Sequence, residues 1–262
     1  MTMIGVFDSG VGGLSVLTEI RRMLPGADLT YLADRAASPY GQRSLEQVMA
    51  LAEACTTHLL NRGADLIVVA CNTASAAALH SLRAIHGGVP FVGMEPAVKP
   101  AASLTRSNVI GVLATAATFQ GELFASVVGR FAGGMTVINQ ACPEWAGLVE
   151  AGIVTGPVAE AAIARDLKPV LAAGADTLVL GCTHYPFLSH LIAARAGAHV
   201  AIVDPAPAVA RQVAAVAAER FRLNGPGTVQ LITTGNAADT RAVVRKLTSI
   251  DQPWTAVTLK RE

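Results

Sequence analysis

A short segment that occurs twice constrains the fold of this chain more than any other feature of its sequence. GADLIVVAC at 63–71 and GADTLVLGC at 174–182 share five of nine residues, at an offset of 111. Each is an apolar run of strand length that ends in a cysteine. A second pair of similar runs, MIGVFDSG at 3–10 and NVIGVLAT at 108–115, occurs in the same order. Two such pairs predict a duplicated unit.

Strand-like and amphipathic stretches alternate along the rest of the chain. Strands are predicted at 3–8, 29–34, 65–70, 91–94, 108–115, 135–142 and 176–182. Helices are predicted at 14–24, 44–63 and 157–174. The tail holds a helix at 207–222, a strand at 229–235 and a further helix, and we expect it to pack on the first half.

This alternation is typical of parallel sheets that helices cover on both faces. We therefore expect the α/β class, with two similar doubly wound parallel-sheet domains related by pseudo-two-fold symmetry and an active site in the cleft between them. Residues 1–95 together with 206–262 are predicted to form the first domain, and residues 96–205 the second. The Pro-rich segment EPAVKPAAS at 95–103 predicts a turn-like crossover between them.

Composition and charge exclude several classes of protein. Hydrophobic residues make up 52% of the chain and charged residues 15%, which predicts a packed chain rather than a disordered one. The net charge of +1 gives no electrostatic basis for binding nucleic acid. The apolar runs are much shorter than the roughly 20 residues of a membrane span. No signal peptide precedes the first strand, so we expect a cytoplasmic protein without a membrane partner.

The four cysteines are Cys55, Cys71, Cys142 and Cys182. In the cytoplasm we expect them to be free thiols. No CxxC pair is present, so no zinc ribbon or other metal site is predicted. Cys55 lies on the apolar face of the helix predicted at 44–63 and is predicted to fill the core. Cys142 has no counterpart in the other half.

Polar residues gather where the predicted strands end, which is where open parallel sheets bind ligands. Asp8 follows the first strand and Cys71 the third, while Thr115 and Cys182 follow two strands of the second half. Two facing halves would place the thiols on opposite sides of one cleft. A lone cysteine after a strand is usually a buried small residue. A matched pair suits a reaction that needs an acid on one face and a base on the other.

Short polar groups flank the two thiols. Ser9, Asn72, Thr73 and Thr183 suit the recognition of carboxylate and ammonium groups, although the same residue types are common helix caps. His184 is placed to tune the Cys182 thiol or to exchange protons beside it. Within DSGVGG at 8–13, the glycines allow either a tight turn into a helix or the approach of an anion, and Asp8 either caps that helix or takes part in proton transfer.

The motifs FDSGVGGLSV, PYG, ACNTAS, GMEPAVKP, ACP…LVE and GCTHYP together closely resemble those of the glutamate racemase family. The resemblance runs from Gly5 to about Asp204. It implies a cofactor-independent enzyme that interconverts L- and D-glutamate and supplies D-glutamate for peptidoglycan synthesis, and hence for cell-wall biogenesis and cell shape. It also leaves a homodimer open.

The resemblance carries residue roles with it. Cys71 and Cys182 match the two catalytic acid/base cysteines, with Cys71 acting on D-glutamate and Cys182 on L-glutamate. Asp8 and His184 match the residues that assist them, and Glu150 matches a further acidic residue near the site. The positions that match substrate-binding residues are Asp8, Ser9, Tyr40, Gly41, Asn72, Thr73, Thr115, Thr118, Thr183 and His184.

The chain departs from the family pattern in two segments. DRAASPYG lacks the usual DTAR-like sequence before PYG, and ATAATFQGELF lacks a serine that often follows the second threonine. Three alternatives stay open: a racemase of a related amino acid such as aspartate, or of a hydantoin; a non-catalytic module that binds a small molecule; and a redox pair, which requires Cα atoms about 5.5–6 Å apart.

Overall fold

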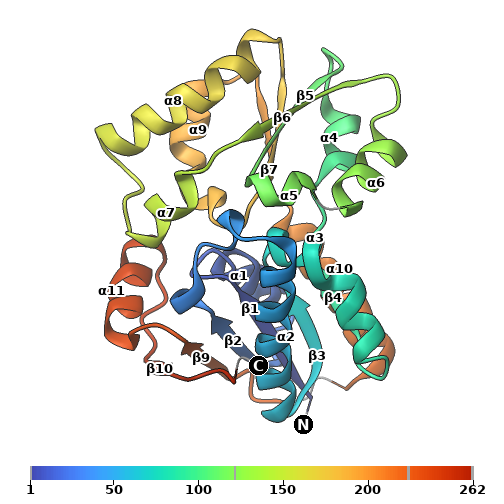
Figure 1. Cartoon of the computed structure of the whole chain (residues 1–262), viewed down its shortest axis with the longest axis vertical. Coiled ribbons are helices and arrows are strands. Elements are labelled where there is room, and N and C mark those ends of the chain that lie inside the picture. Colours follow the sequence, from blue (N-terminus) through green and yellow to red (C-terminus); the bar gives the residue numbers. More distant parts are fainter. Residues whose placement is uncertain (1, 121, 223–224, 261–262) are drawn as a thin grey trace.

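The computed structural model describes residues 2–120, 122–222 and 225–260, which form two parallel β-sheets with helices packed against them (Figure 1). The first sheet has six strands in the order β10-β9-β2-β1-β3-β4. Their bounds are β1 Met3–Asp8, β2 Asp28–Ala33, β3 Ala64–Val69, β4 Phe91–Gly93, β9 Val229–Thr233 and β10 Trp254–Ala256.

The second sheet has four strands in the order β6-β5-β7-β8. Their bounds are β5 Val109–Ala114, β6 Thr136–Ala141, β7 Thr177–Gly181 and β8 Ala201–Val203. All pairings in both sheets are parallel. The order β2-β1-β3-β4 in the first half matches the order β6-β5-β7-β8 in the second. The duplication predicted from the repeated segments is therefore confirmed at the level of topology.

The strand register brings the carboxyl ends of neighbouring strands together. Asp8 at the end of β1 pairs with Ala33 on β2, and Phe7 pairs with Val69 on β3. In the second sheet Ala114 pairs with both Ala141 and Gly181. The residues that follow β1, β3, β5 and β7 are thus adjacent within each sheet, as the sequence predicts.

Eleven α-helices and three 3₁₀ turns connect the strands in the described part of the chain. Those associated with the first sheet are α1 Leu14–Met23, α2 Leu45–Asn61, α3 Asn72–Ile85, α10 Ala206–Arg220 and α11 Ala237–Leu247, with 3₁₀ turns η1 Arg35–Ala37 and η2 Tyr40–Gln42. Those of the second half are α4 Val98–Leu104, α5 Ala116–Gln120, α6 Glu122–Phe131, α7 Trp145–Glu150, α8 Pro157–Ala172 and α9 Ser189–Ala196, with η3 Tyr185–Leu188.

Alternating side chains of each strand bury opposite faces of the sheet, because successive residues of a strand point to opposite sides. Ile4 and Val6 of β1 lie in one apolar cluster with residues of α1 and α10. Phe7 lies in a second cluster with residues of α2 and α3. Helices therefore cover both faces, as expected for a doubly wound sheet. The first of these clusters continues into α7, α8 and α9, so one apolar core spans both halves.

The C-terminal tail packs on the first half, as predicted. Strand β9 pairs with β2, and α10 packs against α1. The segment 95–103 differs from the prediction, because it contains helix α4 rather than only a turn. Pro100 is compatible with this helix because it lies in the first turn, where a backbone N–H has no helical partner to lose. In the described residues, no helix combines the length and the apolar character needed to cross a membrane.

Candidate active site

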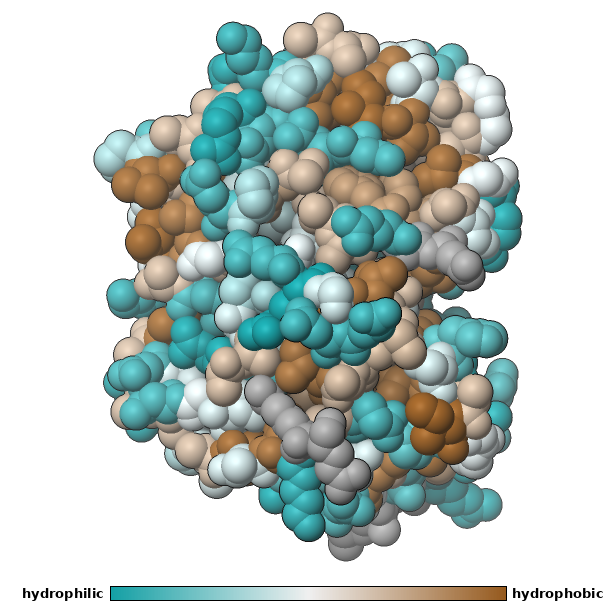
Figure 2. Space-filling model, viewed as in Figure 1, coloured by the Kyte–Doolittle hydropathy of each residue, from teal (hydrophilic) through white to brown (hydrophobic). Residues whose placement is uncertain are grey.

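The site lies between the two sheets, where loops from both halves meet (Figure 1). Cys71 follows β3 and Cys182 follows β7, which are equivalent strands of the two halves. Their side chains are nearly shielded from solvent, with 5% and 8% of the residue surface exposed. The four cysteines all lie in the described residues, and none forms a disulfide. On the face seen in Figure 2, side chains close over the junction between the halves, and hydrophilic residues gather there.

A chain of polar contacts leads away from Cys182. Its Sγ lies 3.6 Å from Nδ1 of His184, and Nε2 of His184 lies 2.8 Å from Oε1 of Glu150. Burial disfavours an imidazolium, but the hydrogen bonds to Cys182 and Glu150 raise the pKa of His184 well above its usual value. Protonation of His184 places a positive charge 3.6 Å from the sulfur atom of Cys182.

Glu150 has further partners besides His184. Its Oε1 accepts a hydrogen bond from the backbone N–H of Val11 at 2.6 Å, and its Oε2 accepts one from Nε of Arg35 at 2.7 Å. Burial opposes ionisation of this carboxyl, yet the bonds to His184 and the charge of Arg35 hold its pKa below the usual value. Glu150 is therefore a carboxylate at neutral pH.

Cys71 has different neighbours. It is the N-cap of α3, where its Sγ accepts a hydrogen bond from the backbone N–H of Ala74 at 3.4 Å. The hydroxyl of Ser9 lies 3.7 Å from the same sulfur atom. Burial, together with the nearby charge of Asp8, raises the pKa of the Cys71 thiol to about 12. At neutral pH Cys71 is thus a protonated thiol.

Asp8 connects the two halves. Its Oδ1 accepts a hydrogen bond from the Thr183 hydroxyl at 3.0 Å, and its Oδ2 accepts one from the N–H of Gly10 at 3.0 Å. Burial raises the pKa of Asp8, and the charge of His184 partly offsets this effect. Both oxygens of the Asp8 carboxyl group are therefore engaged in hydrogen bonds within the protein.

Three hydroxyls form a cluster between the halves. Thr115 Oγ1 lies 3.0 Å from that of Thr73 and 2.9 Å from that of Thr118. Beside them, both polar atoms of the Asn72 amide are buried and have no partner among the described residues. Buried amides are nearly always hydrogen-bonded, so an unpaired amide next to Cys71 is a candidate ligand contact.

The PYG segment is placed less simply than its resemblance implies. The ring of Tyr40 is buried in the cluster with α2, and its hydroxyl donates to Oδ2 of Asp34 at 2.7 Å. Gly41 packs closely on Thr115, because a Cβ at this position would lie 2.6 Å from the Thr115 Cβ. The Tyr40 hydroxyl is therefore engaged in the core of the first half.

The glycines of DSGVGG have a packing reason. A Cβ on Gly10 would lie 1.8 Å from Oε1 of Glu150, and a Cβ on Gly12 would lie 2.4 Å from Nδ1 of His184. Only glycine allows the second half to approach this closely. The glycines of this turn therefore leave the space that His184 and Glu150 occupy in the site.

Two other cysteines lie in the core. Cys55 is fully buried in the cluster with α2 and α3, which confirms its predicted place. Cys142 is also fully buried, with its Sγ 3.6 Å from the backbone oxygen of Gln140. The sequence does not single out Arg35, because the segment that contains it departs from the family pattern. Asp34, the partner of Tyr40, is not singled out either.

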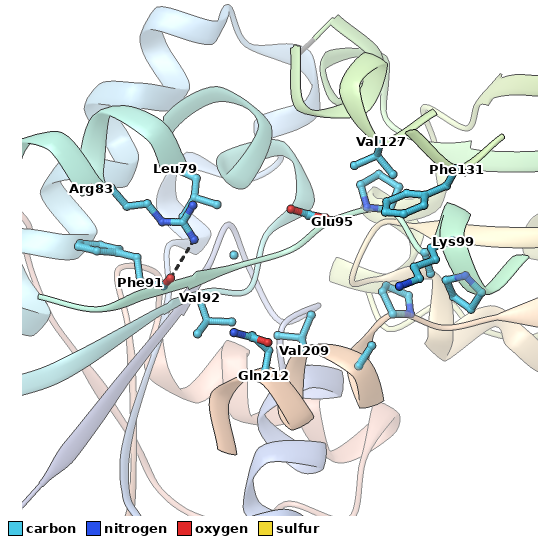
Figure 3. A pocket seen from close by; sticks show the side chains of 16 residues that line it. Leu79, Arg83, Phe91, Val92, Glu95, Lys99, Val127, Phe131, Val209 and Gln212 are labelled. Carbon is cyan, nitrogen blue, oxygen red and sulfur yellow. Dashed lines mark hydrogen bonds between the residues drawn. The ribbon is translucent and has the colours of Figure 1, made fainter. Parts of the chain in front are cut away.

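Two hollows of about 330 and 370 Å³ flank Pro39 at the junction. Gly41 and Thr115 line the first, and Arg35 and Glu150 line the second. Figure 3 shows a different cavity of about 370 Å³, which contains none of the predicted site residues. Arg83, Phe91, Glu95, Lys99 and Gln212 line it, near the segments that cross between the halves. No cluster of His, Cys, Asp and Glu suited to a metal ion occurs in residues 2–120, 122–222 and 225–260.

Known proteins show the family to which the chain belongs. Residues 4–213 match the family described as Asp/Glu/Hydantoin racemase, and the chain belongs to that family. It is 50% identical to a glutamate racemase from Roseiflexus sp. (strain RS-1) over 251 residues, which cover 95% of this chain and 92% of the relative.

Solved structures of glutamate racemases are similar throughout. The Escherichia coli enzyme, crystallised with L-glutamate and the activator UDP-MurNAc-Ala, is 32% identical with a TM-score of 0.88, covering 99% of both chains. An isoform from Bacillus anthracis is 30% identical with a TM-score of 0.87, covering 98% of this chain and 97% of its own. The resemblance seen in the motifs therefore extends over the whole fold.

Proposed function

We propose that the protein is a glutamate racemase in which Cys71 and Cys182 transfer protons on opposite faces of the substrate, without a cofactor. The observation that carries this proposal is the pair of buried thiols at equivalent strand ends of two related halves. The glutamate racemases found among its relatives support glutamate as the substrate.

The surroundings of the thiols suggest their resting states. Burial keeps Cys71 protonated, and the mechanism assigns the thiolate to Cys182, whose sulfur atom lies 3.6 Å from His184 Nδ1. In the direction from L- to D-glutamate, the Cys182 thiolate removes the α-proton and becomes a thiol. The bonding electrons remain on the α-carbon as a planar carbanion. The Cys71 thiol then delivers its proton to the opposite face and becomes a thiolate.

The reverse direction uses the opposite protonation state. The Cys71 thiolate removes the α-proton of D-glutamate, and the Cys182 thiol returns a proton to the other face. Each cycle moves one proton from carbon to sulfur and one from sulfur to carbon, so charge and protons balance. Exclusion of water strengthens every polar contact to the developing negative charge.

The buried polar groups supply substrate contacts. We propose that the unpaired amide of Asn72 binds a carboxylate or the ammonium group of glutamate. The other proposed contacts are Asp8, the hydroxyls of Ser9, Thr73, Thr115, Thr118 and Thr183, the His184 side chain, and the backbone of Tyr40 and Gly41. Of these residues, Asp8 also assists Cys71, and His184 also assists Cys182. Glu150, which is not a proposed substrate contact, supports His184.

The test is the optical rotation of L-glutamate incubated with purified protein in a reducing buffer without added cofactor. Rotation that decays to zero, with D-glutamate recovered, supports the proposal. A constant rotation with glutamate contradicts it, and parallel samples of L-aspartate and a hydantoin then decide between a related racemase and a binding module. Cys71→Ala and Cys182→Ala serve as controls, because neither retains both proton carriers.

We further propose residues 1–95 with 206–262 as one domain and 96–205 as the other, since each sheet takes its strands from one of these sets. A cytoplasmic role in supplying D-glutamate for peptidoglycan and cell shape, and a homodimer, follow from the family resemblance. Dependence of growth on added D-glutamate after gene deletion tests the role, and light scattering tests the assembly.

A further inference from the structure

We propose that Arg35 is a positioning residue for this reaction, which holds Glu150 so that His184 faces Cys182 and thereby serves one of the two proton transfers. The inference rests on the proposed racemase function. Arg35 approaches the reacting thiol only through two intervening side chains, so its effect is indirect.

Arg35 donates hydrogen bonds to both the side chain and the backbone of Glu150. Its Nε donates to the carboxylate at 2.7 Å, and its Nη2 donates to the backbone oxygen of the same residue at 2.9 Å. Its Nη1 donates to the hydroxyl of Thr240 at 3.2 Å. A planar guanidinium makes three such bonds in fixed directions, whereas a lysine ammonium has a single charged centre. The contact therefore fixes the position of Glu150 as well as its charge.

Arg35 is itself held by the C-terminal tail. It opens the η1 turn directly after β2. On one side of it, Asp34 accepts a hydrogen bond from the Thr234 hydroxyl at 2.7 Å, and on the other side the N–H of Ala36 donates to the same hydroxyl at 3.0 Å. The tail that follows β9 thus supports the loop that presents Arg35. This gives the tail a part in the site.

The ion pair crosses the junction between the two halves. Arg35 follows β2 of the first sheet, while Glu150 ends α7 in the second half. Their side chains are only 16% and 13% exposed, so solvent screens the pair less than it screens a surface pair. The N–H of Val11, also from the first half, donates to the other carboxylate oxygen. The support of His184 is therefore complete only when the two halves are together.

Cys71 is supported differently. In the described part of the chain, its hydrogen-bond contacts are the Ser9 hydroxyl and the Ala74 N–H, neither of which carries a charge. Loss of Arg35 should therefore raise the barrier for proton transfer at Cys182 more than the barrier at Cys71. A purely structural residue would not discriminate between the two transfers.

The experiment measures kcat/KM and its substrate deuterium isotope effect with α-deuterated L-glutamate and α-deuterated D-glutamate. Wild type, Arg35→Gln and Arg35→Lys are compared. For Arg35→Gln we expect kcat/KM to fall about 10- to 100-fold, as for loss of a hydrogen bond to a charged group. The fall must be equal in both directions, because the enantiomers have equal free energy. With Cys182 acting on L-glutamate, the isotope effect rises for the L-substrate and falls for the D-substrate.

For Arg35→Lys we likewise expect the isotope effect to rise for the L-substrate and to fall for the D-substrate. The loss of kcat/KM should be smaller than in Arg35→Gln. Arg165→Gln is the matched control, since Arg165 on α8 donates through Nε to the Asp166 carboxylate at 2.7 Å, outside the contacts of either thiol. We expect this control to leave both isotope effects unchanged. If circular dichroism shows that Arg35→Gln does not fold, Arg35→Lys provides the test.

Unchanged kcat/KM and isotope effects in Arg35→Gln would overturn the proposal. Isotope effects that move together, or activity lost only in proportion to unfolded protein, would also overturn it by showing a structural role alone. A wild-type protein that does not racemise glutamate at all would instead overturn the proposed function. The two failures are therefore distinguishable.

Discussion

Cys71 and Cys182 occupy equivalent places in two similar halves, yet their surroundings differ. Cys71 caps a long helix and has a hydroxyl and a backbone N–H as neighbours. Cys182 precedes a short 3₁₀ turn and has a titratable neighbour, His184, which a carboxylate supports in turn. The duplicated fold accounts for where the thiols lie, and the side chains around each cysteine account for their different surroundings.

This difference suits a reaction in which substrate and product are mirror images but the two proton carriers have different tasks. In the proposed mechanism one carrier holds a proton in the free protein and the other lacks one. The raised pKa of Cys71 favours the thiol there, and the hydrogen bonds to Cys182 and Glu150 raise the pKa of His184 beside the other carrier. With Cys71 protonated, the proposed mechanism predicts that the resting enzyme accepts L-glutamate without prior proton exchange.

The largest effect is expected from removing either thiol. Cys71→Ala and Cys182→Ala should each lower racemisation about a thousandfold or more, because each removes one proton carrier. Exchange of the α-proton should survive on one enantiomer only: D-glutamate for Cys182→Ala and L-glutamate for Cys71→Ala. Proton NMR of each enantiomer in D₂O measures this. Equal exchange of both enantiomers by either variant would contradict the assignment of one thiol to each face.

The next effect is expected from Glu150→Gln, which keeps the shape of the side chain and removes its charge. Loss of the bond that stabilises protonated His184 should lower kcat/KM about 10- to 100-fold. The deuterium isotope effect should rise for L-glutamate and fall for D-glutamate, as for Arg35→Gln. An isotope effect that rises for D-glutamate instead would place Glu150 on the side of Cys71.

A smaller loss of activity is expected from Asp8→Asn, with isotope effects that change in the directions opposite to those of Glu150→Gln. The charge of Asp8 raises the pKa of Cys71, so its removal should weaken the thiolate as a base and lower kcat/KM by less than the roughly 10- to 100-fold expected for Glu150→Gln. Here the isotope effect should rise for D-glutamate and fall for L-glutamate. The same pattern as in Glu150→Gln would show that Asp8 serves Cys182, to which Thr183 connects it.

The smallest effect concerns stability rather than rate. The folded protein holds the pKa of Glu150 below its unfolded value, so its stabilising contribution is present above the unfolded pKa of about 4.3 and is lost as pH falls through the folded pKa. The raised pKa of His184 acts in the other sense: its contribution is present below about pH 6.5 and is lost as pH rises through the folded pKa.

Wild type should therefore exceed Glu150→Gln in free energy of unfolding by about 2 kcal/mol near pH 6, and by less below about pH 4. Urea denaturation of both proteins over this range measures the difference. A difference that grows on acidification would mean that Glu150 is not ionised in the folded protein.

Much of this arrangement could be predicted from the sequence, because it depends on local patterns. The apolar runs before Cys71 and Cys182 locate the third strand of each half, and parallel pairing then places both thiols at sheet edges. Helix α4 was not predicted, because the prolines of its segment indicate a turn. Pro100 lies in the first turn of the helix, where proline is tolerated, and the sequence alone does not show where the helix begins.

The partners of the thiols depend on tertiary contacts instead. Arg35 and Glu150 are 115 residues apart, and no periodicity connects them. Glu150 was found only through the family resemblance, and Arg35 was not found. The packing of Gly10 and Gly12 on Glu150 and His184 was likewise invisible in the sequence, where the glycines indicated only a turn or an anion site.

The most direct test of the central claim is the position of deuterium early in the reaction of L-glutamate in D₂O. Product and remaining substrate are separated at low conversion, and deuterium at the α-carbon of each is measured by mass spectrometry. Two thiols on opposite faces predict deuterium in the D-glutamate formed and the original proton in the L-glutamate that remains. Deuterium appearing equally fast in both would show that a single base serves both faces, and would contradict the account.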